Sequence, residues 1–282
     1  MPDNRERDRK DHYLPRGFLK GFIDPANKDL AKPLWHFDLE TAEWSRESPG
    51  SIGWERGMYD YHPGTNVLEH PDEVFERFER EFPLVREHLL RRNFKGWVKQ
   101  HKHFLLEYAQ MMRARSPLFL QQQTAQNENT RIVTVTSVGP GNQVGVDTTV
   151  PYPPPAQFIR NRTITAMREE IKKGPDWMEN FQWCLRYTRS VFDPFVTGTQ
   201  PIVVEGRFPD SNDAPVLEDA LKDHNTIIWF PLCWQACLVG AVDRFDEGTA
   251  EAPPSLISHV RGMFRRPSTG YVISPREIDW VL

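Results

Sequence analysis

The residue best suited to acid–base chemistry stands near the amino end of the chain, where His12 opens an apolar and aromatic segment. An imidazole titrates near neutral pH and can therefore take up or release a proton during a reaction. Chain starts usually fray unless they are packed, so a start this apolar is expected inside the fold. His12 is thus a candidate general acid or base. The alternative is a structural role, in which the ring bonds to the backbone and fixes the first strand.

Arg115 is the second candidate, because it closes an apolar stripe at helical spacing. The other members of the stripe are Trp97, His101, Phe104, Tyr108 and Met111. A guanidinium on this face points inward, and a buried cation needs a carboxylate or an anionic ligand. The sequence therefore predicts either a clamp for phosphate or carboxylate, or an ion pair with Glu79, Glu81 or Asp38. His101 is interpreted as a satisfied core histidine.

Two glutamates complete the candidate site. Glu79 and Glu81 lie in a charged run, residues 76–81, most of which must be solvated. One of them can turn inward toward Arg115, where pairing would keep it charged and let it orient His12. The predicted catalytic set is therefore His12, Arg115, Glu79 and Glu81. His103 and Glu107 share a helix face but have no evident third ligand, so we expect neither a metal nor a cofactor.

The spacing of apolar residues and the positions of glycine and proline predict the helices and strands that must position these groups. Helices are expected over 72–82, from 83 to about 90, and over 94–116, 156–173, 176–192 and 253–264. Strands are expected over 34–39, from 44, and over 131–138, 201–205, 226–232, 236–240 and 271–273. Helices thus occupy the middle of the chain and strands lie toward both ends. This order predicts an α+β fold, with a mostly helical middle and a mixed or antiparallel sheet from the N- and C-terminal strands.

Composition sets the scale and the compartment. The chain has 282 residues, of which 39% are hydrophobic, which is enough for one large core. We expect a flexible tail over 1–11 and a single α+β domain over 12–282, with a Pro/Gly-rich loop at 139–155. The mean hydropathy is −0.60, and no long apolar run or signal peptide is evident, which argues against a membrane protein. Three cysteines fit reduced thiols and a cytoplasmic location.

The charge balance bears on nucleic-acid binding. The formal net charge is −4, whereas a dedicated duplex-binding domain is usually basic. One basic cluster is formed by Arg86, Arg91, Arg92, Lys95 and Lys99. A solvated helix face explains this cluster better than a nucleic-acid patch does.

Several short motifs follow one another in a characteristic order. They are His12 and Pro15 with Leu19 and Phe22, then Trp35 to Asp38, Ser48-Pro49, the glutamate-bearing run 76–81, Arg115-Ser116-Pro117 and Phe230-Pro231-Leu232. In this order, from residue 11 to about 274, the chain resembles the bacterial domain-of-unknown-function family 4238. The late turn of that family carries an aspartate where this chain has Thr199. The resemblance implies an architecture more than an activity, and any chemistry of that aspartate is lost or replaced here.

Two functions are compatible with these residues. The first is a hydrolase, of the nuclease-like phosphodiesterase type, in which His12 is the acid or base and Arg115 stabilises developing negative charge. The alternative is a non-catalytic module that binds nucleic acid or another protein through aromatic residues and the proline-rich segment 151–155. Thr199, in place of the family aspartate, favours the second. A homodimer is compatible with both, and we favour the enzyme.

Overall fold

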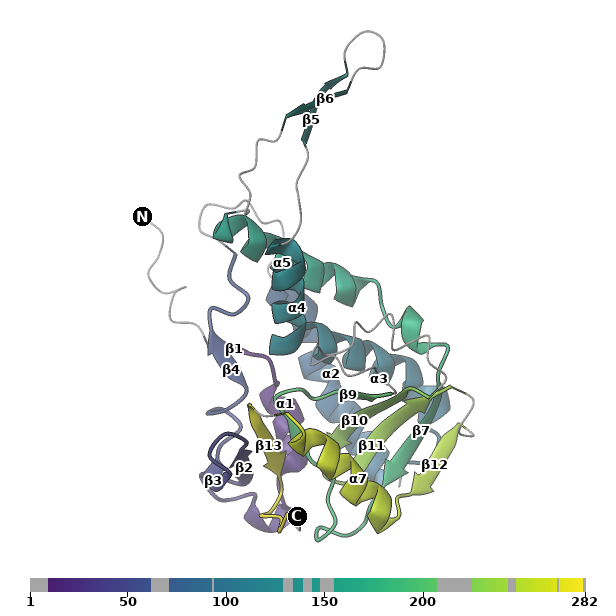
Figure 1. The fold of residues 1–282 in the computed structure, drawn as a ribbon. Helices are drawn as coiled ribbons and strands as arrows, with labels where there is room; N and C mark the ends of the chain where they lie inside the picture. The colour runs from purple at the N-terminus through teal and green to yellow at the C-terminus, as the bar shows by residue number, and fades with distance from the viewer. Residues whose placement is uncertain are drawn as a thin grey trace.

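The computed structural model describes residues 10–61, 71–92, 94–128, 134–138, 144–147, 155–206, 225–242, 247–267 and 269–280. Its helices are α1 (Arg16–Leu19), α2 (Pro71–Arg91), α3 (Trp97–Ala114), α4 (Pro117–Glu128), α5 (Ala156–Lys172) and α7 (Pro254–Arg265), with 3-10 turns at Lys20–Phe22, Pro25–Asn27 and Asp176–Met178. The predicted α+β class is confirmed (Figure 1). None of the described helices combines the length and apolar character needed to cross a bilayer.

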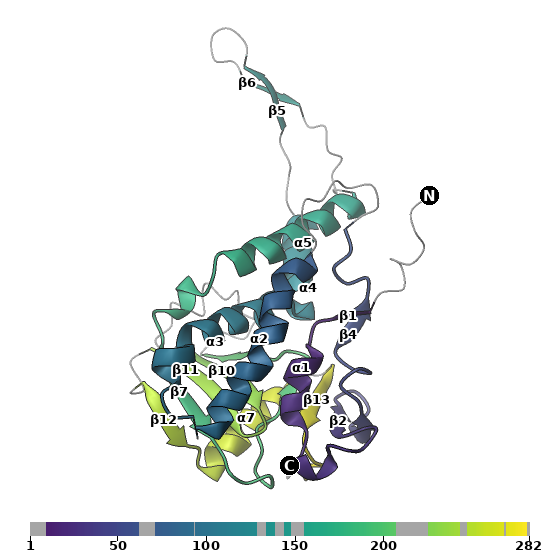
Figure 2. The same ribbon diagram turned by 180° about the vertical axis from the view of Figure 1, so that it is seen from behind.

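The larger sheet has the strand order β12-β7-β11-β10-β9 and is mixed, because β12 (Gly248–Glu251) runs parallel to β7 (Gln182–Tyr187) while the other pairs are antiparallel. Its centre, β10 (Ile227–Cys233) and β11 (Ala236–Ala241), is buried along nearly its whole length. Figures 1 and 2 show why: α2 and α3 cover one face of the sheet and α7 covers the other. The two edge strands are β12 and β9 (Val203–Glu205).

A second sheet joins the two ends of the described chain. Its antiparallel order is β3-β2-β13-β8, with β2 at Leu34–Asp38, β3 at Glu43–Glu47, β8 at Thr197–Gly198 and β13 at Tyr271–Ser274. A two-stranded ribbon pairs β1 (Lys10–His12) with β4 (Trp54–Arg56) and sets His12 opposite Trp54. The remaining strands, β5 (Thr134–Val138) and β6 (Val144–Asp147), form an antiparallel hairpin.

The N-terminal segment reaches the centre of the core, as its apolar sequence predicts. Phe18 is fully buried and packs its ring parallel to Phe230 at a centroid distance of 6.0 Å. Tyr108 of α3 stacks on Phe82 of α2 at 4.0 Å. One hydrophobic cluster therefore joins α1, α2, α3 and the larger sheet, and it ties the first strand to the body of the fold.

The predicted break at Pro83 is wrong, because α2 continues through it. Proline has no N–H, so the Glu79 carbonyl loses its partner inside the helix, at a cost of about 3 kcal/mol. Burial of Phe78 and Phe82 on the core side offsets this cost, since each buried phenyl ring contributes about 1.5–3 kcal/mol. Gly17 of α1 fits closely here: a Cβ at that position would lie 3.0 Å from the Pro83 ring.

The predicted helix over 176–192 is also wrong. Only a 3-10 turn forms at Asp176–Met178, and β7 follows at Gln182–Tyr187. Because β7 lies inside the sheet, Trp183, Cys184 and Leu185 are all buried. A strand covered on both faces has a continuous apolar run, and such a run cannot be told from a buried helix by spacing alone.

Three further boundaries differ from the prediction. Lys10 and Asp11 belong to β1, so the predicted tail is too long by two residues, while residues 1–9 lie outside the described part of the chain. The predicted loop 139–155 contains β6. The helix α4 had no counterpart in the prediction, because its residues show almost no amphipathic periodicity. The single-domain organisation stays a prediction.

Candidate functional site

A cleft of about 420 Å³ lies between the ribbon strand β1 and the helix α2. Its lining includes three of the four predicted site residues, His12, Glu79 and Arg115. Lys10, Asp11, Tyr59, Glu73, Phe75 and Glu76 complete the lining. The structure therefore brings together an imidazole, a guanidinium and several carboxylates from parts of the chain that are far apart in sequence.

Arg115 lies at the C-cap of α3 and is only 2% exposed, as its place in the apolar stripe predicts. Its Nη1 is 2.8 Å from Glu79 Oε1, and its Nη2 donates to the backbone carbonyl of His12. The guanidinium also lies 4.1 Å above the centroid of the Phe75 ring. Burial lowers the pKa of Arg115, but Tyr59 and Glu79 outweigh this effect and the net pKa is raised. Arg115 is therefore a fixed cation.

These contacts include one of the two alternatives that the sequence left open for Arg115, the ion pair with Glu79. Both terminal nitrogens are already bonded within the protein. The Nε atom is buried and, among the described residues, has no hydrogen-bond partner. The structure thus contains the ion pair with Glu79 and leaves little of the guanidinium for an incoming anion. Through these bonds Arg115 links β1 to α2.

The His12 imidazole is half-buried at the wall of the cleft. Arg16 Nε donates to His12 Nε2 over 3.4 Å, so Nε2 carries the lone pair in this geometry. Burial lowers the pKa of His12, and the charges of Arg16 and Arg115 lower it further. Glu79 and a hydrogen bond with the Lys10 backbone oppose this shift but do not cancel it. The ring is therefore neutral at pH 7 and able to accept a proton.

The two predicted glutamates have different surroundings. Glu81 forms ion pairs of 3.8 Å with the exposed arginines Arg77 and Arg80. Two residues along a helix turn the side chain by about 200°, so Glu79 and Glu81 cannot face the same cleft. Glu81, predicted as a site residue, therefore lies outside the lining of the cleft.

Glu73 and Glu76 were missed, although the spacing of three residues between them and Glu79 predicts a shared helix face. Asp11 was also missed, and its Oδ2 accepts a bond from the Tyr59 amide over 3.1 Å. The sequence placed Asp11 in a tail, so it gave no signal for this contact. Carboxylates therefore outnumber cations on the walls of the cleft.

Thr199, which stands where the family has an aspartate, lies away from the cleft lining. Its Oγ1 accepts from the Tyr271 amide over 2.9 Å, and its own amide donates to the Tyr271 carbonyl over 3.1 Å. These bonds tie the end of β8 to β13. An aspartate at this position could accept the same hydrogen bond from the Tyr271 amide through its carboxylate. Threonine and aspartate can therefore make the same contact between β8 and β13, and this contact does not require the aspartate of the family.

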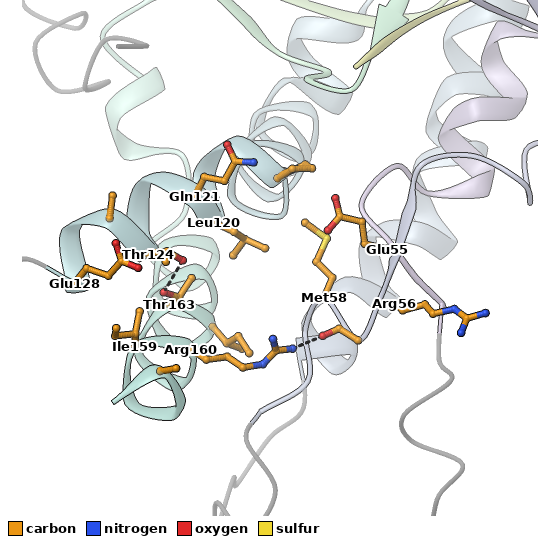
Figure 3. A pocket seen from close by; sticks show the side chains of 15 residues that line it. Glu55, Arg56, Met58, Leu120, Gln121, Thr124, Glu128, Ile159, Arg160 and Thr163 are labelled. Carbon is orange, nitrogen blue, oxygen red and sulfur yellow. Dashed lines mark hydrogen bonds between the residues drawn. The ribbon is translucent and has the colours of Figure 1, made fainter. Parts of the chain in front are cut away.

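A larger cavity of about 530 Å³ lies between α4, α5 and the loop after β4 (Figure 3). Leu120 and Ile159 give it an apolar wall, and the hydroxyls of Thr124 and Thr163 lie 3.4 Å apart beside it. Arg160 donates to the backbone carbonyls of Gly57 and Asp60. As far as the described residues show, neither an imidazole nor a thiol lines this cavity, and its acid–base groups are the carboxylates of Glu55 and Glu128.

No three His, Cys, Asp or Glu side chains of the described residues gather closely enough to hold a metal ion. Nothing matched among curated proteins or among solved structures. A family model described as "Protein of unknown function (DUF4238)" matches residues 10–261, which is most of the chain. The resemblance carried by the motifs from His12 to Leu232 is thereby confirmed, and the chain belongs to the DUF4238 family.

Proposed function

We propose that the protein is a hydrolase whose reaction takes place in the cleft between β1 and α2, with His12 as the general base. The observation that carries this proposal is the His12 imidazole at the cleft wall, whose Nε2, within the described part of the chain, accepts only a long bond from Arg16. The lowered pKa of His12 favours the neutral ring that a general base requires. A weak bond of this kind is readily exchanged for one from a substrate-bound water. Among the described residues, the lining holds no serine, threonine or cysteine, and we propose water, activated by His12, as the nucleophile.

In the proposed reaction, His12 first takes up a proton and then releases it. His12 Nε2 takes a proton from water as the water oxygen forms a bond to the electrophilic centre of the substrate. The imidazolium then gives this proton to the leaving group as the bond to that group breaks. Arg115 fixes the His12 backbone through its carbonyl, and Glu79 lies near enough to stabilise the transient imidazolium. Both act as positioning or electrostatic groups around His12.

The charge of the cleft favours a neutral or cationic substrate. Glu73, Glu76 and Asp11 add negative charge to the lining, and the Arg115 guanidinium is already paired. A phosphodiester carries a negative charge and would meet these carboxylates. We therefore propose an ester or amide substrate with a neutral or cationic group beside the scissile bond. The nuclease-like chemistry expected from the sequence has less support.

The test compares His12→Gln with His36→Gln, a half-buried histidine in β2 whose pKa burial also lowers. Chromogenic esters and amides, neutral and cationic, are assayed beside bis-p-nitrophenyl phosphate. We expect His12→Gln to lower kcat by about 10²–10⁴-fold, with unchanged circular dichroism, and His36→Gln to keep full activity. The wild-type rate should fall on acidification below about pH 6.5, where a free imidazole gains its proton. Equal activity of the two variants, or hydrolysis of none of the substrates, would refute the proposal.

A binding function is the second candidate, and the larger cavity favours it. Its volume of about 530 Å³ lies within the range of small-molecule sites, and it combines an apolar wall with a few hydroxyls. Ligand-observed NMR with a small-fragment mixture would test it, with Leu120→Trp filling the space. Of the proline-rich segment 151–155, only Pro155 is described. A nucleic-acid or protein partner, a homodimer and a cytoplasmic, bacterial origin stay predictions from the sequence.

A further inference from the structure

Two histidines outside the cleft contact each other across the α2–α3 helix pair. His88 Nδ1 lies 2.6 Å from His101 Nε2, and the two rings are nearly perpendicular, with an interplanar angle of 89°. At this distance one nitrogen must carry a hydrogen and the other a lone pair. The contact is therefore compatible with two neutral rings or with one shared charge, but not with two imidazolium ions.

The groups around the pair do little to stabilise a second positive charge on it. Burial lowers the pKa of His101, and the charges of His88 and Arg92 lower it further. Glu87, which precedes His88 in the chain, pairs with Arg91 at 2.5 Å, and Glu247 pairs with Lys102, the residue after His101. His103 is 72% exposed and pairs with Glu107 instead.

We propose that the His88–His101 contact is a pH-sensitive junction that joins α2 to α3 while at least one ring is neutral and separates when both rings are protonated. Two N–H groups cannot point at each other over 2.6 Å, so the second proton forces the nitrogens apart. This proposal is independent of the hydrolase proposed above, because neither ring lines the cleft.

The separation is expected at the turn between the helices. His88 lies near the end of α2 and His101 near the start of α3. The stacked rings of Phe82 and Tyr108 and the Glu79–Arg115 pair join the same helices further along. Nine residues separate His88 from Glu79, about 14 Å of helix. These contacts involve no histidine, so they keep the rest of the helix pair together.

The experiment measures two quantities on the full-length protein in a buffer with a chelator, so that protons are the only ligands of the rings. Histidine ring resonances are followed by NMR from pH 8 to 5, and amide exchange is followed at pH 7 and 5 after correction for intrinsic rates. We expect the pair to titrate in two separate steps. Exchange of amides 86–92 and 97–101 should accelerate by up to about tenfold per pH unit, because the open form binds one more proton.

Variants distinguish a pH response of the His88–His101 contact from a general sensitivity of the protein to acid. In His101→Gln and in His88→Gln, the remaining ring no longer faces a second imidazole, so the two-step behaviour and the local acceleration of exchange should both disappear. The matched control His103→Gln removes an exposed histidine of the same helix and should leave both observations unchanged. Two rings that titrate independently of each other, or exchange in this region that does not respond to pH, would overturn the proposal. If one glutamine variant fails to fold, the wild-type titration and the other variant still decide it.

Discussion

The ion pair between Glu79 and Arg115 is the contact whose removal we expect to be most informative. Glu79→Ala removes the carboxylate 2.8 Å from Arg115 Nη1 and leaves the cation in place. The side chain of Arg115 is 2% exposed, whereas that of Glu79 is 42% exposed. The substitution therefore leaves a buried positive charge without its counter-ion.

The size of the effect follows from these exposures. Breaking a fully buried pair by removing one partner costs about 3–5 kcal/mol, whereas an exposed pair contributes about 0–1 kcal/mol. Arg115 keeps its bond to the His12 carbonyl, and water in the cleft can solvate Nη1 once the carboxylate is gone. We therefore expect Glu79→Ala to lower the free energy of unfolding by about 2 kcal/mol. Glu79→Gln keeps an acceptor oxygen and should cost about half as much.

Urea unfolding followed by tryptophan fluorescence measures this loss of stability. The slope m should be the same for wild type and variants if both unfold in a two-state manner. Glu81→Ala is the matched control, since it makes the same substitution in the same helix but removes only contacts of 3.8 Å to exposed arginines. It should change the free energy of unfolding by less than about 0.5 kcal/mol. If Glu79→Ala and Glu81→Ala are equally stable, the reasoning about Arg115 is wrong.

Two glycines and one tyrosine provide further predictions. Gly198→Ala places a Cβ 2.6 Å from the Tyr271 carbonyl oxygen and should cost about 1–3 kcal/mol, whereas Gly262→Ala in α7 meets nothing within 4 Å and should stabilise the protein by about 0.5–1 kcal/mol. Thermal unfolding measures both, and a Gly198→Ala protein as stable as wild type would contradict the fitted β8–β13 contact. Burial raises the pKa of Tyr59 to about 12, so the folded state holds its proton above the ordinary value near 10. Stability should therefore fall as pH rises from 10 toward 12; absorbance at 295 nm showing Tyr59 ionised in folded protein at pH 10.5 would contradict this.

Much of the fold could be predicted where one face of an element is apolar and the other polar. The stripe from Trp97 to Arg115 predicted α3 and the inward direction of the guanidinium, and both are confirmed. Prediction failed where tertiary packing outweighed local preference. Pro83 lies inside α2 because apolar burial on both sides of it exceeds the lost hydrogen bond, and β7 resembles a helix in sequence because sheet neighbours and covering helices bury both its faces.

The candidate site divides in the same way. The sequence by itself determined which groups are able to do chemistry, an imidazole in an apolar segment and a cation on an apolar helix face, because these properties are local. Only the tertiary structure decided that Glu79, and not Glu81, meets Arg115, since this depends on the rotation of α2 against α3. It also decided that both terminal nitrogens of Arg115 are bonded within the protein, because the second of them donates to the carbonyl of His12, 103 residues earlier in the chain. Contacts between such distant residues depend on how whole elements pack, and no local pattern encodes them.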